Sequence, residues 1–464
     1  MQRMKLFRIG VLAFFIMCHV MSSAKKFPQE GVIYRLTLKD KQGTPYCISH
    51  PEQFLSQKAI ERRQRQGLAI DSTDLPISPC YIKEIEKCKL KVLGGSKWNN
   101  TVLTWSPDSL SPNSLEELPF VVKIQQVWAA RPNNTNNPIY PKREPDWKDW
   151  DFERASIYGL AEDQISMING IPLHNAGYQG QGMTIAVLDA GFLNVDSIAA
   201  FKSVKIVGTK NFVAVNDKSI FRQEEHGTMV LSDLAINVPH AFVGTAPEAF
   251  YWLLRTEDFA SENTIEEDYW AAAAEFADSV GVDIISSSLG YHKFDDDNAS
   301  YHYADLNGNT SIISHTASML AQKGIIHVNS AGNEGNKHWK KINVPADAPN
   351  TLAVGALNTE HLNATFSSVG PSADGRVKPD VMSMGNPAMV IGGTGQIEEA
   401  HGTSFACPIL AGMVACLWQA LPNKTAIEIE DLVRKSADNF QTPNNVFGYG
   451  IPDFWKAYQL GQQH

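Results

Sequence analysis

From about residue 150 onward, short apolar runs alternate with longer amphipathic stretches. The run 183–191 is almost continuously apolar, which is typical of a strand buried on both faces. Similar runs follow at 204–209, 250–256, 282–290, 324–333 and 350–356. The stretches 226–237, 264–281 and 311–323 between them predict helices. Strands that alternate with helices predict an α/β fold in which helices cover both faces of a parallel sheet.

The N-terminal third has a different pattern. In 31–39, Val32, Tyr34, Leu36 and Leu38 alternate with polar residues and predict one strand. The stretch 51–67 predicts a charged helix, 88–105 predicts two strands around a turn, and 116–127 predicts a helix end followed by a strand. We therefore expect a small α+β domain, followed over 131–147 by an exposed linker rich in Pro and Asn.

Near the end of the chain, 402–421 predicts a helix that is apolar on almost every side and should run through the core. Cys407 and Cys416 lie nine residues apart in this helix, about 13 Å along its axis. They face opposite sides and cannot form a disulfide with each other. We expect both to be buried as small apolar groups, and the spacing of the remaining cysteines indicates no disulfide framework.

The first residues have the pattern of a secretory signal peptide. Basic residues up to Arg8 precede the apolar run 9–17, and the small residues Ser22 and Ala24 predict cleavage after Ala24. The run is too short to span a bilayer, so we expect a secreted protein without a stable membrane anchor. The net charge of −10 argues against nucleic acid as a partner.

Four polar side chains stand at predicted strand ends or helix starts: Asp189, His226, Asn333 and Ser404. Each has an ordinary structural reading, as a turn residue, a surface histidine or a helix cap. Together they supply what acyl transfer needs, because a hydroxyl nucleophile requires a base, an orienting carboxylate and donors for the oxyanion. Parallel strands also gather reacting groups at their carboxyl ends. The combination therefore favours a hydrolase site.

The chain resembles the subtilisin-like serine protease family (subtilases) from about residue 160 to its end. The matching stretches are "IAVLDAGF" around Asp189, "HGTMVLSDLA" from His226, "SSSLG" at 286–290, "NSAGNEG" at 329–335, "GTSFACP" at 402–408, "FSSVGP" at 366–371, "KPDV" at 378–381 and "GYGIPD" at 448–453. The pair formed by "HGT" and "GTSFACP" is the most specific of these.

The resemblance implies a role for each matching residue. Ser404 would be the nucleophile, His226 the general base, and Asp189 the carboxylate that orients the imidazole. The Asn333 side chain and the Ser404 backbone N–H would form the oxyanion hole. Ser288, Leu289 and Gly290 would form an open strand edge that pairs with the substrate backbone, and Tyr291 would narrow the neighbouring pocket.

A second His-Gly-Thr sequence begins at His401. In the family this position, just before the nucleophile motif, is variable and often holds Ser. We therefore expect His401 to take no part in the chemistry, and His226 to be the catalytic copy.

We expect a signal peptide at 1–24, a propeptide-like α+β domain at 25–130, a linker with the processing site at 131–150 and a subtilisin-like catalytic domain at 151–464. The expected partners are a protein or peptide substrate and the chain's own propeptide, acting as an intramolecular inhibitor. Two alternatives are a catalytically inactive binding protein on this fold and an esterase that uses the same triad.

The chemistry expected from the family needs no cofactor and no metal. Many subtilases also bind structural calcium, and the insert 291–311 is rich in acidic residues. Its acidic residues match no complete ligand spacing, which favours a solvated loop.

Overall fold

The structure is a computed structural model that describes residues 31–107, 115, 118–130, 150, 155–213 and 219–463. The predicted signal peptide and all of the predicted linker except Trp150 lie outside the described residues.

A seven-stranded parallel sheet forms the centre of the larger part of the molecule, as predicted. Its strands run in the order β13-β12-β11-β10-β5-β9-β6. They are β5 (Thr184–Asp189), β6 (Lys205–Asn211), β9 (Phe250–Arg255), β10 (Ile284–Ser287), β11 (Ile326–Ser330), β12 (Thr351–Asn358) and β13 (Val381–Asn386). Every residue of β5 is buried, as its continuous apolar pattern predicts. The edge strand β13 was not predicted from the sequence.

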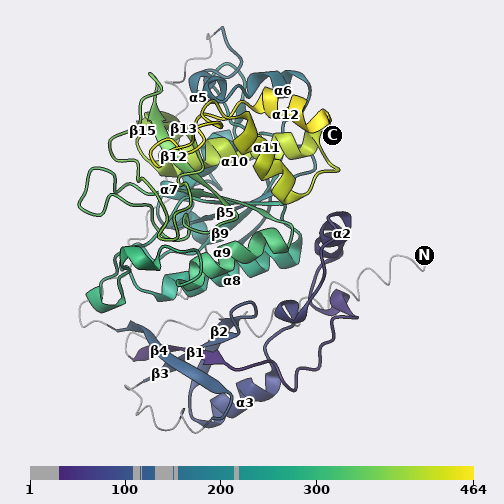
Figure 1. Cartoon of the computed structure of the whole chain (residues 1–464), viewed down its shortest axis with the longest axis vertical. Coiled ribbons are helices and arrows are strands. Elements are labelled where there is room, and N and C mark those ends of the chain that lie inside the picture. Colours follow the sequence, from purple (N-terminus) through teal and green to yellow (C-terminus); the bar gives the residue numbers. More distant parts are fainter. Residues whose placement is uncertain are drawn as a thin grey trace.

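Helices cover both faces of this sheet (Figure 1). One face carries α8 (Ile265–Val280) and α9 (Ile312–Gln322). The other carries α5 (Glu162–Met167), α6 (Ile171–Asn175), α7 (His226–Ala235), α10 (Thr403–Ala420), α11 (Ala426–Ser436) and α12 (Phe454–Gln462). Two short hairpins complete this part, β7 (Asn237–Val238) with β8 (Phe242–Val243) and β14 (Ala388–Ile391) with β15 (Ile397–Ala400).

The helix α10 runs through the core, as its uniformly apolar sequence predicts. It is long and apolar enough to cross a membrane, but 89% of it is buried inside the protein. Cys407 and Cys416 are both free and buried, which confirms that they serve as small apolar groups. Cys47, Cys80 and Cys88 also form no disulfide within the part of the chain that the structure describes.

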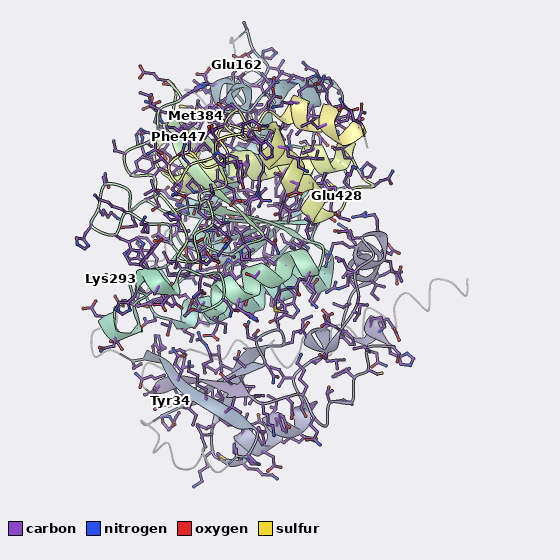
Figure 2. All side chains as sticks on the ribbon, viewed as in Figure 1. Tyr34, Glu162, Lys293, Met384, Glu428 and Phe447 are labelled. Atoms are coloured by element: carbon purple, nitrogen blue, oxygen red, sulfur yellow. The ribbon has the colours of Figure 1, made fainter. Side chains whose placement is uncertain are left out.

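The N-terminal unit contains an antiparallel sheet in the order β2-β3-β1-β4. Its strands are β1 (Val32–Leu38), β2 (Lys91–Ser96), β3 (Thr101–Ser106) and β4 (Val121–Ala129), and its helices are α2 (Gln57–Arg65) and α3 (Pro79–Lys87). Figure 2 shows Tyr34 on this sheet, far from Met384 in the parallel sheet. The α+β prediction is correct, although α3 was missed and the predicted helix at 51–67 is shorter.

The N-terminal unit packs on α8 through buried polar contacts (Figure 1). Glu275 of α8 accepts hydrogen bonds from the backbone N–H groups of Lys97 and Trp98, at 2.9 and 3.0 Å. One turn further along the helix, Asp278 pairs with Arg62 and Arg63 of α2, and all three side chains are buried. Burying a charge without a partner costs free energy. This surface of α8 therefore favours a partner that brings positive charges to Asp278, as α2 does.

The insert 291–311 differs from the solvated loop that was expected. Tyr291, Phe294 and Leu306 are buried in the core beside α8 and α9, while 293, 295–298, 302–304 and 309–310 face solvent. The expectation rested on the polar residues of the insert. The three apolar or aromatic side chains instead anchor it to the enzyme body.

Candidate active site

Asp189 and His226 come together at the carboxyl edge of the parallel sheet. Asp189 ends β5 and is 1% exposed, and His226 is the first residue of α7. The His226 Nδ1 lies 2.9 Å from Asp189 Oδ1 and 3.1 Å from Oδ2. The Ala190 N–H also donates to Asp189 Oδ1 at 2.8 Å and fixes the carboxylate. Asp189 therefore holds the imidazole with Nδ1 inward, so that Nε2 points away from the carboxylate.

Gly227 allows this close approach. A Cβ at this position would lie 2.3 Å from the Gly191 carbonyl oxygen and 3.0 Å from the Asp189 Cβ. Only a residue without a side chain brings the start of α7 so near to the end of β5. The glycine in "HGT" thus positions the histidine against its carboxylate.

The electrostatic surroundings raise the pKa of His226 to about 9. Burial lowers the pKa of the ring, but the charge of Asp189 and its hydrogen bond together raise it by more. The carboxylates of Glu257 and Glu224 raise it further. The site therefore stabilises an imidazolium, which is the form a general base acquires when it accepts a proton.

Ser404 stands in the first turn of α10, where the N-terminal end of the helix favours negative charge. Its Oγ donates to the Ser288 carbonyl at a long 3.3 Å, and its own carbonyl accepts from the Ser288 hydroxyl at 2.7 Å. Phe405, the next residue, places its ring 5.7 Å from the His226 ring. The first turn of α10 therefore lies next to His226, and the Ser404 hydroxyl is turned toward Ser288 and forms no hydrogen bond with the ring.

Asn333 follows β11 in a turn and has its carboxamide fixed by α10. Its Oδ1 accepts from the Thr403 N–H at 2.9 Å and from the Thr403 hydroxyl at 3.0 Å. The Gly332 N–H in turn donates to the Thr403 hydroxyl at 3.1 Å. These bonds leave the Asn333 Nδ2 free to donate. Nδ2 lies close to Gly402, because a Cβ added to that glycine would be 3.6 Å from it.

Two N–H donors consequently face the space beside the Ser404 hydroxyl. Within the part of the chain that the structure describes, no group accepts from the Ser404 N–H or from the Asn333 Nδ2. Paired donors of this kind can stabilise an oxyanion that forms on a carbonyl attacked by the hydroxyl.

The segment 288–290 lies along the same space. Ser288 and Leu289 are buried, and the Leu289 carbonyl is held by the Asn329 amide at 3.0 Å. No other described residue forms a hydrogen bond with the backbone N–H or C=O of Gly290. Gly290 therefore presents an open edge to which an extended peptide can add.

His401, the second histidine of a His-Gly-Thr sequence, points elsewhere. It is exposed, and its Nδ1 lies 2.7 Å from Asn386 Oδ1. That contact places it outside the Asp189–His226 pair.

Two residues near the site were not given a role from the sequence. Thr403 orients Asn333, and its signal was its place inside "GTSFACP". Glu257, just after β9, accepts from the Tyr291 hydroxyl at 3.1 Å. Burial and the charge of Asp189 raise the pKa of Glu257 to about 8. Nothing in the sequence around Glu257 indicated that it would approach the histidine.

No group of three or more His, Cys, Asp or Glu side chains in the described ranges is arranged to hold a metal ion.

Comparison with known proteins agrees with this geometry. The model of the subtilase family matches residues 180–450, and the model of the Peptidase S8 propeptide domain of Bacteroidota matches residues 33–142. Subtilisin NAT of Bacillus subtilis subsp. natto is 28% identical over 288 residues, which cover 62% of this chain and 68% of that protein. The subtilisin of Bacillus pumilus is 28% identical over 297 residues, covering 64% and 98%. A thermostable alkaline protease of Halalkalibacterium halodurans is 26% identical over 362 residues, covering 76% and 90%.

Proposed function

We propose, because this chain belongs to the subtilase family, that it is a secreted serine endopeptidase made as a zymogen. The reaction is the hydrolysis of a peptide bond through an acyl-enzyme on Ser404. The observation that carries the proposal is the pair of unoccupied N–H donors, from Ser404 and Asn333, beside a hydroxyl that adjoins the Asp189–His226 pair.

In the first half of the reaction, Ser404 Oγ turns from the Ser288 carbonyl and attacks the substrate carbonyl carbon. His226 Nε2 takes the hydroxyl proton, and Asp189 stabilises the imidazolium through Nδ1. The carbonyl oxygen becomes an oxyanion that accepts from the Ser404 N–H and the Asn333 Nδ2. The C–N bond then breaks, the leaving amine takes the proton from His226, and an ester on Ser404 remains.

In the second half, a water molecule attacks the ester carbonyl and gives its proton to His226. The oxyanion again accepts from the same two donors. The ester C–O bond breaks, Ser404 Oγ recovers the proton, and the new carboxyl product leaves. The cycle consumes one water per peptide bond and requires no cofactor and no metal.

The N-terminal unit acts as the inhibitory propeptide of the zymogen in this proposal. The propeptide match at 33–142 and the buried contacts of this unit with α8 support that role. The signal-peptide pattern at 1–24 and the relationship to bacterial subtilisins support export from the cytoplasm.

The two alternatives fit the site less well. An inactive binding protein would not need all four of Asp189, His226, Asn333 and Ser404, whose residue types and contacts suit the proposed catalysis. An esterase would not need an extended edge, whereas the free backbone groups of Gly290 suit a peptide strand.

Three matched alanine variants test the proposal. Ser404→Ala and His226→Ala should lose peptide hydrolysis by about 10⁶, the loss found in subtilisin when either group is removed. His401→Ala should keep most activity, because His401 contacts Asn386 and not Asp189. A serine-directed fluorophosphonate should label the wild-type protein at Ser404. Normal turnover in Ser404→Ala would exclude the proposal, and activity lost in His401→Ala but kept in His226→Ala would reassign the base.

A further inference from the structure

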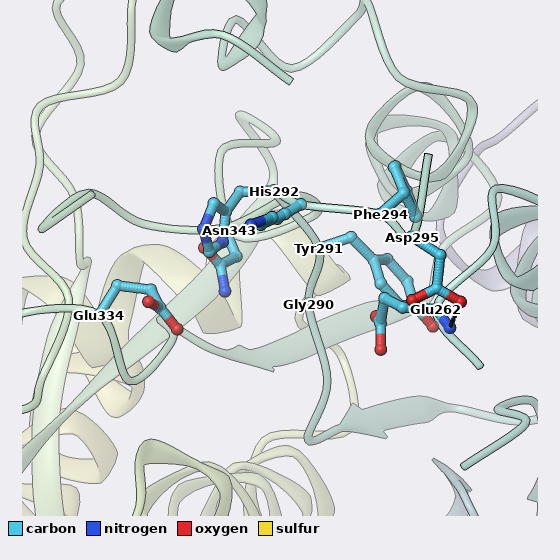
Figure 3. A pocket seen from close by; sticks show the side chains of 9 residues that line it. Glu262, Gly290, Tyr291, His292, Phe294, Asp295, Glu334 and Asn343 are labelled. Atoms are coloured by element: carbon cyan, nitrogen blue, oxygen red, sulfur yellow. Dashed lines mark hydrogen bonds between the residues drawn. The ribbon is translucent and has the colours of Figure 1, made fainter. Parts of the chain in front are cut away.

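A cavity of about 360 Å³ opens beside the segment 288–290, at Gly290 (Figure 3). Nine residues line it: Glu262, Gly290, Tyr291, His292, Lys293, Phe294, Asp295, Glu334 and Asn343. Neither the proposed chemistry nor the packing of the core uses this space.

Asn343 connects the cavity with the reacting groups. Its side chain lies against two glycines. A Cβ added to Gly290 would be 3.0 Å from the Asn343 Cβ, and a Cβ added to Gly332 would be 3.1 Å from the Asn343 Nδ2. Asn343 therefore sits between the proposed substrate edge and the turn that carries Asn333. In the proposed function, a substrate whose carbonyl meets Asn333 directs the side chain before the scissile bond into this cavity.

Asn343 is 7% exposed, and its buried Oδ1 accepts a hydrogen bond of normal geometry from no described residue, although the carboxamide adjoins the His292 ring and raises its pKa. A buried acceptor without a partner costs free energy that a ligand with an N–H donor can recover. Rotation of the carboxamide by 180° exchanges its oxygen and nitrogen, so Asn343 can present the oxygen to the cavity.

Carboxylates stand at both ends of the cavity. Glu334, next to Asn333, lies at one end, and Glu262 and Asp295 lie at the other (Figure 3). Burial and the charge of Asp295 raise the pKa of Glu262 to about 7. The repulsion between these groups would be relieved by a cation bound in the cavity.

The basic groups that line the cavity offset this charge only in part. Lys293 is 68% exposed at the outer edge of the enzyme (Figure 2), and its ammonium lies 3.8 Å from Asp297. Burial lowers the pKa of His292 by more than the Glu334 charge and the neighbouring Asn343 amide raise it. Outside the lining, the exposed side chain of Lys337 places its ammonium 3.0 Å from Glu334, and an ion pair at the surface is weak and exchangeable.

We propose that this cavity selects a basic side chain, lysine or arginine, at the residue immediately before the scissile bond. The inference rests on the proposed function and specifies its substrate. The cationic group replaces Lys337 at Glu334 and donates to the Asn343 oxygen, while Glu262 and Asp295 add a favourable potential. An acidic substrate side chain is repelled by the same carboxylates.

The chain's own linker offers such side chains. The stretch 131–149 contains Arg131, Lys142, Arg143 and Lys148, and it adjoins the unit that is proposed to inhibit the enzyme. Processing by the enzyme itself should therefore cut directly after one of these basic residues.

The test compares peptides that differ only in the residue before the scissile bond: Arg, Lys, Leu or Glu. The processed enzyme is used, and its active sites are counted by fluorophosphonate labelling. We expect kcat/KM for Arg and Lys to exceed that for Leu by at least about tenfold, with Glu the poorest substrate. Glu334→Gln should reduce the Arg-to-Leu ratio about tenfold. Lys337→Gln should increase that ratio, because it removes the competing cation.

Glu360→Gln, at an exposed site away from the cavity, is the matched control and should leave the ratio unchanged. A labelled, active enzyme that prefers Leu to Arg would overturn the basic preference and leave the proposed function standing. A ratio that neither Glu334→Gln nor Lys337→Gln changes would show that another surface selects the substrate. Absence of both labelling and hydrolysis for every peptide would overturn the proposed function together with this inference.

Discussion

The proposed oxyanion hole depends on the orientation of one carboxamide. Thr403 gives Asn333 Oδ1 two donors, its N–H and its hydroxyl, so the Nδ2 must face the opposite side. Thr403 itself is held by the Gly332 N–H. The donor is thus fixed before any substrate binds, and no reorganisation is needed when the oxyanion forms.

Asn333→Ala should lower kcat by about 10²–10³, the size of the loss found in subtilisin when a side-chain oxyanion donor is removed. KM should change little, because the donor acts on the oxyanion and not on the ground-state carbonyl. Steady-state kinetics on one peptide would check this. Asn336→Ala, at an exposed position three residues away, is the control. A large change in KM with kcat intact would make Asn333 a binding residue instead.

Glu257 should influence the titration of the proposed base. Its carboxylate is one of the charges that raise the pKa of His226 to about 9. A general base acts only when it is deprotonated, so activity should be lost as the pH falls through this pKa.

Glu257→Gln removes that charge and should shift the acid limb of the profile of kcat/KM against pH to lower pH, by up to about one unit. The pKa of His226 falls in this variant because its protonated ring loses the stabilising negative charge of Glu257. Glu360→Gln should leave the limb in place. A shift toward higher pH in Glu257→Gln would contradict this account of the electrostatics.

Three secondary-structure elements meet at the site, and each delivers one reacting group. The end of β5 supplies Asp189, the first residue of α7 supplies His226, and the first turn of α10 supplies Ser404. Because α7 and α10 pack on the same face of the sheet, their N-terminal ends lie next to each other. The helix α8 lies on the opposite face and serves another purpose, as the surface on which the N-terminal unit docks.

Asp278 of α8 should be important for that docking. It is fully buried between Arg62 and Arg63. Burial raises its pKa, but these two guanidinium charges lower it to about 2. Because its pKa is lowered, the charged Asp278 stabilises the interface at every pH above the ordinary pKa of a carboxyl group. This stabilisation is lost as the pH falls through about 2.

Asp278→Asn removes the buried carboxylate that pairs with Arg62 and leaves Arg63 with Asp74 alone, and it should destabilise the interface by about 3–5 kcal/mol. Denaturant unfolding of the Ser404→Ala precursor would measure this. The N-terminal unit should separate at a lower denaturant concentration when Asp278→Asn is added. Asp297→Asn, at a side chain that is 85% exposed, should change stability by less than about 0.5 kcal/mol. Equal effects of the two variants would show that the buried pairs do not hold the unit in place.

The whole molecule has the organisation of a precursor, with a small unit docked on a larger one. The N-terminal unit contacts α8 near both ends, through the pair of Arg35 with Asp268 near its start and the pairs of α2 with Asp278 near its end. A prefolded unit can hold its C-terminal tail in the candidate site at a small entropic cost. The tail that inhibits the enzyme should therefore also be the segment that the enzyme cleaves.

Maturation should produce a new N-terminus between about residues 128 and 150, where the linker offers an extended backbone to a protease. Sequencing the N-terminus of the secreted form would locate it. A separately expressed fragment 25–130 should inhibit the mature enzyme at micromolar concentration. A secreted active form that still begins at Lys25, or a fragment without effect, would contradict the zymogen model.

The sequence by itself determined the fold class and the candidate reacting residues. Continuous apolar runs such as 183–191 are typical of strands covered on both faces, and the helical stretches between them predict a parallel sheet. Asp189, His226, Asn333 and Ser404 stood at strand ends or helix starts, where backbone geometry alone brings side chains to one edge. Their local motifs were enough to make them candidates, because each signal lies within a few residues.

Only the tertiary structure decided the features that join distant segments. The buried pairing of Arg62 and Arg63 with Asp278, the approach of Glu257 to His226 and the position of Asn343 below Gly290 have no local signal. The insert 291–311 was misjudged for the same reason, since its polar composition did not reveal that Tyr291 and Phe294 are anchored beside α8. Burial and charge depend on which elements pack together, and that packing is a property of the folded chain as a whole.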